Sequence, residues 1–231
     1  PPTRGAYVRY PHEAMVGIVI LEAQRAGALV VGEDLGTVEP WVRDYLRSRG
    51  ILGTSVAWFE ANHDGTPLAP EAYREYCMAS VTTHDMPPTA GYLAKDHIAL
   101  QHYLGMLTED VDVEIANFDH QLDVWRWILA ERGLYHPGEE GDDDVEAMVL
   151  ALHRYVLQSP ARVVTAALVD AVGDRRTQNQ PGTVDEYPNW RVPLSGPDGC
   201  LLTLEDVFAS QRAQRLASVM NGFATPLVGM R

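Results

Sequence analysis

Ala28-Leu29-Val30-Val31-Gly32-Glu33-Asp34-Leu35-Gly36 is the stretch around which the fold of this chain can be read. Residues 28–31 are apolar and predict a short buried strand, which ends in two carboxylates before a helix begins near Pro40. The carboxyl ends of parallel strands are where α/β proteins place their chemistry. Because successive strand side chains point opposite ways, Glu33 and Asp34 should differ in role, and we assign the chemistry to Glu33. The alternative is that both simply cap the next helix in water.

Helices and strands alternate around this stretch. Helical patterns end at Gly27 and Gly50, and two further strands are predicted at residues 54–59 and 78–82. Alternation of this kind with short turns favours a parallel sheet with right-handed crossovers. The fold class is therefore α/β.

Residues 95–158 have a different pattern of apolar residues and are predicted to be almost wholly helical. Apolar side chains recur there at helical spacing, and we interpret them as core: Phe118, Leu122, Trp125, Leu129, Met148, Val149, Leu152, Tyr155 and Val156. The acidic turn 137–144 is predicted to be solvated, because the ligand spacing of a calcium loop is missing. Residues 163–169 suit a fourth strand or a buried helix, and two short helices are predicted near 204–210 and 211–220.

Composition excludes several classes of protein. The chain is 46% hydrophobic and 22% charged, which is typical of a folded domain. A net charge of −14 argues against nucleic acid and anionic membranes as partners. No apolar run approaches the ~18 residues of a membrane span, and no signal peptide is visible. Cys77 and Cys200 are too few for a disulfide framework, so we expect a reduced, cytoplasmic protein.

Three predicted strands end in carboxylates, Glu33, Glu60 and Asp85, which should meet on one rim. Two carboxylates facing each other across a cleft are what glycosyl transfer or hydrolysis requires. Aromatic side chains near these strand ends could stack on sugar rings, although core packing is the more common role of each of them taken alone: Trp58, Phe59 and Trp190.

Other chemistries fit the sequence less well. His63, Asp64, His84 and Asp85 are of metal-ligand type, but no two histidines stand four apart on a helix. Gly-x-Ser-x-Gly, a phosphate loop and a dinucleotide fingerprint are all absent. We therefore do not expect a metal site.

Four motifs resemble, in this order, those of the 4-α-glucanotransferases, also called amylomaltases or disproportionating enzymes. They are Val-Gly-Glu-Asp-Leu-Gly-Thr-Val at 31–38, Thr-His-Asp-Met-Pro at 83–87, Asn-Gln-Pro-Gly-Thr at 179–183 and Tyr-Pro-Asn-Trp-Arg at 187–191. Residues 5–11 resemble the family's segment before the acid/base strand. The family has an α-amylase-like (β/α)8 barrel, and the resemblance covers nearly the whole chain.

The resemblance implies a retaining transglycosylase that moves α-1,4-glucan segments between malto-oligosaccharides, or onto glucose, without a cofactor. Glu33 matches the general acid/base. Asp85 matches the carboxylate that holds sugar hydroxyls and stabilises the transition state. Four further residues match positions that line the sugar subsites: Gly36, Phe59, His84 and Asn179.

One feature departs from the family pattern. The family's nucleophile is an Asp that precedes the acid/base residue, whereas Asp34 is the first Asp of this sequence. A complete barrel takes about 250 residues before insertions. We therefore expect the C-terminal part of a larger enzyme, about strands five to eight, whose partner is the missing N-terminal part. In this interpretation residues 1–94 carry the first strands, 95–158 form a helical insert, and 159–231 complete the barrel.

Such a part should be inactive alone, and its unpaired strand edge should favour self-association. Two other hypotheses stay open. One is an α-glucan hydrolase of the same barrel superfamily, and the other is a non-catalytic sugar-binding fragment.

Overall fold

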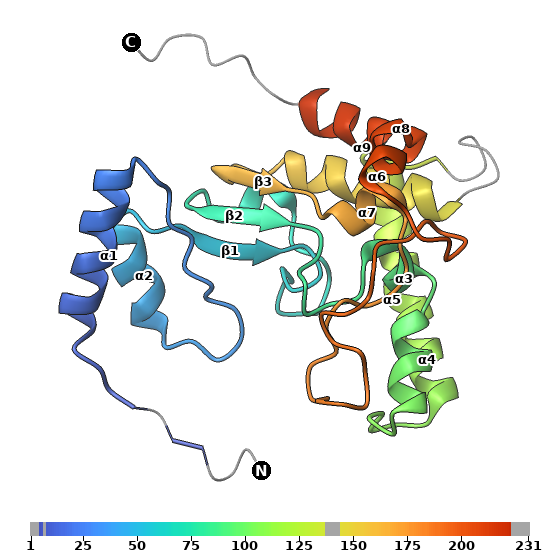
Figure 1. Cartoon of the computed structure of the whole chain (residues 1–231), viewed down its shortest axis with the longest axis horizontal. Coiled ribbons are helices and arrows are strands. Elements are labelled where there is room, and N and C mark those ends of the chain that lie inside the picture. The colour runs from blue at the N-terminus through green and yellow to red at the C-terminus, as the bar shows by residue number, and fades with distance from the viewer. Residues whose placement is uncertain (1–4, 7, 137–143, 223–231) are drawn as a thin grey trace. The chain divides into compact units, whose positions relative to one another are not determined.

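The computed structural model describes residues 5–6, 8–136 and 144–222, and the chain divides into two compact units. The first unit comprises Pro1–Thr54 with Tyr76–Met78, and the second comprises Ser55–Glu75 with Ala79–Arg231. Figure 1 labels their helices and strands. Most of the predicted acidic turn, residues 137–143, lies outside the described residues.

The first unit contains helices α1, His12–Ala26, and α2, Pro40–Ser48. α1 ends where predicted, because Gly27 adopts the left-handed φ of 62° and the N–H of Ala28 then donates to Ala23 O at 2.9 Å. α2 begins with Pro40 in its first turn, where the missing N–H would have no helical partner.

The strand predicted at residues 28–31 is only partly formed. Val31 makes an isolated parallel bridge to Leu52, supported by hydrogen bonds from Leu52 N–H to Val30 O (3.0 Å) and from Gly32 N–H to Leu52 O (2.8 Å). The predicted burial is wrong, since Leu29 is 78% exposed. The side chains of Leu29 and Val31 stay open to solvent, because backbone pairing along an edge covers neither face of the segment.

The adjacent carboxylates Glu33 and Asp34 occupy different environments, as the strand alternation predicted. Asp34 is 2% exposed, and its Oδ1 accepts the N–H of Thr54 at 2.8 Å. Glu33 is exposed, and its Oε1 accepts the N–H of Leu35. The N-cap residue of α2 is Glu39, so the alternative in which the pair caps that helix in water is wrong. Asp34 is a structural residue that joins its segment to β1.

Asp34→Ala should destabilise the chain, because it removes a buried charged acceptor. Loss of such a hydrogen bond typically costs about 1–3 kcal/mol. Urea unfolding of the 231-residue chain measures the change, with Asp44→Ala on the exposed side of α2 as the matched control. Equal midpoints for the two variants would remove this structural role from Asp34.

A three-stranded sheet follows, with order β1-β2-β3: Gly53–Val56, Cys77–Ser80 and Val163–Thr165. Gly53 N–H donates to Tyr76 O and Ala57 N–H to Ser80 O, and this constant offset is that of parallel strands. β1 is shorter than predicted, because Phe59 N–H turns back to Val56 O at 2.8 Å.

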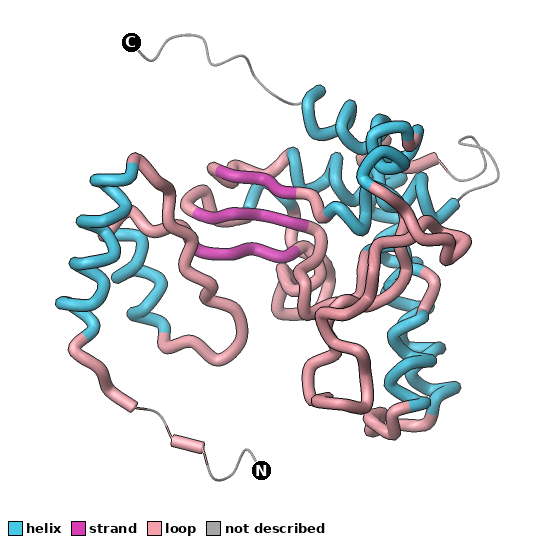
Figure 2. Tube along the Cα trace, viewed as in Figure 1, coloured by secondary structure: helices cyan, strands magenta, loops and turns pink. Residues whose placement is uncertain are grey.

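The second unit is mainly helical, as Figure 2 shows. Its elements are η2 Pro70–Ala72, α3 Thr89–Leu93, α4 Asp96–Tyr103, α5 Val111–Glu131, α6 Asp144–Leu157, α7 Leu168–Val172, α8 Leu204–Ala209 and α9 Gln211–Gly222. The helical prediction for residues 95–158 is confirmed in its described part, and all nine predicted core side chains are buried. Residues 163–169 combine both predicted alternatives, a strand and then the start of a helix.

Aromatic rings connect the end of β1 with α3, α4 and α5. Trp58 lies 4.7 Å from Tyr92 and 5.4 Å from Trp125, centroid to centroid. His97 stacks on Tyr92 at 4.4 Å and meets the edge of Phe118. Burial lowers the pKa of His97 to about 4, although the charge of Asp96 opposes this shift.

The folded chain should therefore lose stability as the pH falls from 6.5 toward 4. Over this window the unfolded chain binds a proton at His97, whose ordinary pKa is 6.5, and the folded chain does not. At about 1.4 kcal/mol per pKa unit the difference is on the order of 3 kcal/mol. His97→Phe should flatten this part of the curve of melting temperature against pH, whereas His102→Phe, on the exposed side of α4, should leave its slope unchanged.

Two further observations complete the fold. Cys77 is buried, Cys200 is exposed, and both are free thiols. Among the residues with described coordinates, no helix combines the length and apolar character needed to span a bilayer.

Candidate active site

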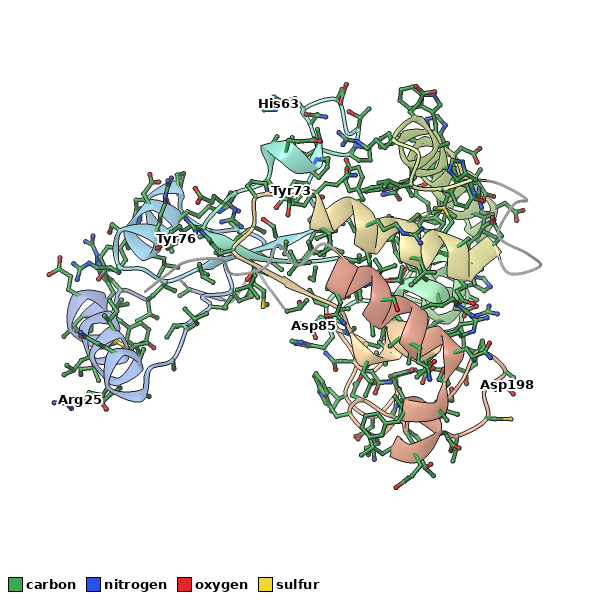
Figure 3. The ribbon with its side chains drawn as sticks, turned by 90° about the horizontal axis from the view of Figure 1, so that it is seen from above. Arg25, His63, Tyr73, Tyr76, Asp85 and Asp198 are labelled. Atoms are coloured by element: carbon green, nitrogen blue, oxygen red, sulfur yellow. The ribbon has the colours of Figure 1, made fainter. Side chains whose placement is uncertain are left out.

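The turn after β2 carries His84 and Asp85, both exposed. Thr82 Oγ1 donates to Pro87 O at 2.9 Å, and Met86 N–H donates to Thr83 O, so the turn is closed by its own residues. His84 Nε2 lies 3.5 Å from Asp85 Oδ2. Figure 3 labels Asp85 among the side chains of the second unit.

A long loop brings Asn179 to this turn. The loop after α7 runs from Gly173 to Thr203 and appears pink in Figure 2. Within it Asn179 Nδ2 donates to Asp85 Oδ1 at 2.6 Å, across 94 positions of sequence. His84, Asp85 and Asn179, three of the predicted site residues, therefore lie together in the second unit.

The two motifs of this loop, residues 179–183 and 187–191, hold each other in place. Gln180 N–H donates to Asn189 Oδ1 at 2.7 Å, and Asn189 Nδ2 donates to Thr183 Oγ1 at 2.8 Å. The hydroxyl of Tyr187 donates to Thr177 O at 2.6 Å. A loop with this many internal bonds can hold Asn179 in one position without regular secondary structure.

The base of the loop is anchored by a buried carboxylate and a close backbone contact. Asp174 is fully buried, accepts the N–H of Ser195 at 2.8 Å and binds Arg176, whose pKa this hydrogen bond raises. A Cβ at Gly91 in α3 would lie 2.1 Å from Arg175 O. Glycine is thus required where the helix meets the start of the loop.

Trp190 lies beside His84, and the core packing that the sequence analysis favoured for it is wrong. It is 64% exposed, which excludes core packing, and its ring centroid lies 5.4 Å from that of His84. Its φ of 61° is left-handed, a conformation that costs a non-glycine residue about 1–3 kcal/mol and that is enriched at functional sites. Trp58, in contrast, is core at 8% exposure.

A cavity of about 290 Å³ opens beyond the carboxyl ends of β2 and β3. Its walls come from the turn after β2, from the segment between β3 and α7, and from the long loop, and they include His84, Met86, Leu168 and Gln178. The sequence analysis gave no role to Met86, Leu168 or Gln178, because each lines the cavity only when these three segments meet.

The remaining predicted residues lie on other segments. Phe59 is 56% exposed in the turn after β1. Glu33 and Gly36 belong to the first unit, where Gly36 has the left-handed φ of 76° that glycine tolerates. That Glu33 and Asp85 face one cleft stays a prediction. Within the described ranges no three His, Cys, Asp or Glu side chains gather as metal ligands, and His63-Asp64 and His84-Asp85 form no joint cluster.

This arrangement is suited to hydroxylated ligands. Asp85 offers carboxylate oxygens to hydroxyl groups, Asn179 holds that carboxylate, and Trp190 presents an exposed ring face beside His84. Polar groups in this position, at the carboxyl ends of parallel strands, are typical of the active sites of α/β enzymes.

Comparison with known proteins identifies the family. A family model described as 4-alpha-glucanotransferase matches residues 1–198, and the chain belongs to this family, which confirms the resemblance seen in the motifs. The 4-alpha-glucanotransferase of Mycobacterium tuberculosis (strain ATCC 25618 / H37Rv) is 58% identical over 229 residues, which make up 97% of this chain and 31% of the relative. The Haemophilus influenzae protein of the same name is 30% identical over 84% of this chain and 28% of its own length.

Solved structures agree with this result. The amylomaltase from Corynebacterium glutamicum superposes with a TM-score of 0.84 at 41% identity, over 92% of this chain and 31% of that one. The amylomaltase from Streptococcus agalactiae, solved in complex with acarbose, gives a TM-score of 0.57 at 17% identity over 95% and 36% of the two chains, and shows the fold alone. The chain thus spans about a third of the length of the proteins it matches.

Proposed function

We propose that this chain is the C-terminal part of the catalytic barrel of a 4-α-glucanotransferase, acting on malto-oligosaccharides with glucose or another glucan as acceptor. The observation that carries the proposal is the hydrogen bond from Asn179 to Asp85 beside the exposed ring of Trp190. It joins two family motifs that are far apart in sequence into one hydroxyl-binding group.

In this proposal Glu33 is the general acid/base of a retaining double displacement. A carboxylate nucleophile attacks the anomeric carbon while Glu33 gives its proton to the departing 4-oxygen. Glu33 then takes the proton of an incoming 4-hydroxyl, which displaces the nucleophile and restores the enzyme. Asp85 holds ring hydroxyls and stabilises the positive charge that develops on the sugar.

Four further residues are proposed to bind the sugar substrate. His84 and Asn179 stand beside Asp85, and Phe59 offers an exposed ring. Gly36 leaves the backbone after Glu33 open to a close approach, since nothing lies within 4 Å of where its Cβ would be.

We further propose that β1, β2 and β3, together with the Val31 bridge, correspond to strands five to eight of the barrel. Residues 95–158 would then be a helical insert on its outside. The nucleophile would come from a part of the enzyme outside the printed sequence, because no Asp stands before Asp34 and the relatives are about three times longer.

Exposed apolar side chains in the first unit support a partner for this part. Helix α1 has no buried residue, and its exposed apolar side chains include Met15, Ile18 and Leu21. The partner we propose is the remainder of the same enzyme, and self-association would replace it when the part stands alone. A cytoplasmic location and the lack of nucleic-acid and membrane partners stay predictions.

The purified 231-residue chain should show no transfer activity on maltotriose. A retaining mechanism needs two carboxylates roughly 5 Å apart, one of them the nucleophile. Chromatography of the products tests this, and a full-length enzyme that carries this sequence provides the positive control. Longer oligomers with glucose identify a transferase, whereas shortening alone supports the hydrolase hypothesis.

Two outcomes would change the proposal. Disproportionation by the chain alone, abolished by Glu33→Gln, would show that a residue within it serves as nucleophile. A full-length enzyme that binds maltotriose without turning it over would favour the non-catalytic sugar-binding hypothesis.

A further inference from the structure

Thr89 and Asp170 form a buried pair of residues next to the candidate site. Thr89 N–H donates to Asp170 Oδ1, and the Thr89 hydroxyl donates to Asp170 Oδ2, each at 2.7 Å. Thr89 is fully buried, and Asp170, which is 5% exposed, lines the same cavity as His84. The two residues lie 81 positions apart and outside the four motifs of the sequence analysis. This buried pair therefore joins segments that no local pattern connects.

The buried pair lies between the two segments that meet at the candidate site. Thr89 is the first residue of α3 and follows Asp85 by four positions. Asp170 lies in α7, three positions before Gly173, where the loop that carries Asn179 begins. Figure 1 labels α3 and α7 in the second unit. The two hydrogen bonds of the pair thus connect the end of the turn to the start of the loop.

Two further contacts hold α3 and α4 against the start of the loop. The backbone of Gly91 approaches that of Arg175 closely, and the guanidinium of Arg175 donates to both carboxylate oxygens of Asp96, at 2.6 and 2.7 Å. Gly91 and Asp96 lie six and eleven positions beyond Asp85. The buried pair lies nearer to Asp85 in sequence than either of these contacts, so it acts most directly on the turn.

His153 on α6 completes the surroundings of the Asp170 carboxylate. His153 Nδ1 lies 2.8 Å from Val149 O, and since a carbonyl oxygen only accepts, Nδ1 carries a hydrogen. His153 Nε2 has no hydrogen-bond partner among the described residues and lies 3.8 Å from Asp170 Oδ2. Burial raises the pKa of Asp170, whereas the charge of His153 and the hydrogen bonds from Thr89 oppose this rise. Donors and a basic group on separate helices therefore favour one position for this carboxylate.

We propose that Asp170 is a positioning residue for the glucanotransferase reaction, which through Thr89 sets the turn that carries Asp85 against the loop that carries Asn179. The role of Asp85 in this inference rests on the proposed function. A displacement of about 1 Å in a group that acts on the substrate can cost roughly 10²-fold in rate. The hydrogen bond of 2.6 Å from Asn179 to Asp85 would not survive such a displacement.

Thr89→Val tests the proposal in a full-length enzyme that carries this sequence. Valine has nearly the shape of threonine but no hydroxyl, so Asp170 Oδ2 loses its donor while the N–H still reaches Oδ1. We expect kcat on maltotriose to fall about tenfold or more. KM should change less, because an interaction made mainly in the transition state acts on kcat. Thr89→Ser keeps the hydroxyl and should restore most of the lost rate.

Thr66→Val is the matched control. Thr66 also donates its N–H and its hydroxyl to one aspartate, Asp64, at 3.0 and 2.6 Å, but in an exposed turn that does not line the cavity at His84. Its kcat should equal that of the parent enzyme. Rates are measured well below the unfolding transition, which circular dichroism locates for each variant. If Thr89→Val lowers the melting temperature but leaves kcat unchanged, the pair is structural only and the proposal is overturned.

A second variant covers the case in which Thr89→Val does not fold. Thr89→Ala leaves space for a water molecule, which can donate to Asp170 Oδ2 but cannot hold the start of α3 in place. The expected fall in kcat has the same direction. An unchanged kcat in this folded variant would contradict the proposal in the same way.

Hydrogen exchange measured by mass spectrometry follows the two segments directly. In Thr89→Val the backbone amides of residues 83–89 and 174–183 should exchange faster, because both segments lose a shared anchor. In Thr66→Val faster exchange should be confined to residues 61–67.

Asp85→Asn separates this inference from the proposed function. Turnover should fall in this variant if the proposed role of Asp85 is correct, and kcat of the Thr89 variants then decides the positioning inference. Normal turnover in Asp85→Asn would overturn the proposed role of Asp85 and leave hydrogen exchange to decide. In that case faster exchange of both segments in Thr89→Val supports the positioning, and unchanged exchange overturns it.

Discussion

Glu33→Gln is expected to reduce the release of glucose from maltotriose by about 10²–10⁴-fold in a full-length enzyme that carries this sequence, the usual contribution of a general acid. The amide has nearly the shape of the carboxyl group but cannot deliver a proton to the leaving 4-oxygen. Its oxygen can still accept the N–H of Leu35, as Glu33 does, so the variant should fold normally. Initial rates of glucose release measure the effect.

The matched control is Glu39→Gln. Glu39 is also exposed and lies before α2, where its side chain makes no cap hydrogen bond, so the rate should stay within about twofold. A donor whose leaving group needs no proton, such as α-maltosyl fluoride, sharpens the test. Glycosylation by this donor should be nearly normal in Glu33→Gln if the lost function is protonation. Near-normal rates on maltotriose would exclude Glu33 as the acid/base.

Gly91→Ala is expected to lower the free energy of unfolding by about 3 kcal/mol or more, at the upper end for overpacking. The added Cβ would lie 2.1 Å from Arg175 O and 2.9 Å from Arg175 C. Both are backbone atoms, so no side-chain rotation relieves the contact and α3 or the long loop must move. Because Asn179 lies four positions beyond Arg175, we also expect its hydrogen bond to Asp85 to be disturbed.

Gly17→Ala is the matched control. Gly17 lies within α1, and nothing stands within 4 Å of the position that its Cβ would take. Alanine in the interior of a helix is favoured over glycine by roughly 0.5–1 kcal/mol, so this variant should be slightly more stable. Urea unfolding compares the two. A Gly91→Ala midpoint equal to that of the parent would mean that the contact between α3 and Arg175 yields without cost.

Two predictions of elements failed, the first because of a local turn and the second because of what the rest of the chain leaves uncovered. The strand at residues 54–59 was predicted too long, because apolar content does not reveal that Phe59 N–H turns back to Val56 O. The stretch 28–31 was predicted buried, because a run of apolar residues does not reveal which of its edges and faces are covered. Burial depends on what the rest of the chain brings against a segment, and period-2 or apolar patterns carry no information about that.

The candidate site was predicted by residue type but not by arrangement. His84, Asp85 and Asn179 were identified through motifs, and the structure brings these three together. Trp190 could not be chosen over Trp58 from sequence, since both are tryptophans near polar turns. The two residues differ in their surroundings. Trp190 lies in the long loop with a left-handed backbone conformation, whereas Trp58 packs against Tyr92 and Trp125.

The sequence by itself determined the features that depend on neighbours within a few residues. Gly27 ends α1, Pro40 begins α2, and the apolar stripes of α5 and α6 define buried faces, because caps and the 3.6-residue period are local properties. The tertiary structure alone decided that Asp34 binds Thr54 and that Asn179 reaches Asp85. Those contacts join residues 20 and 94 positions apart, and they exist only after strand pairing and helix packing have brought distant segments together.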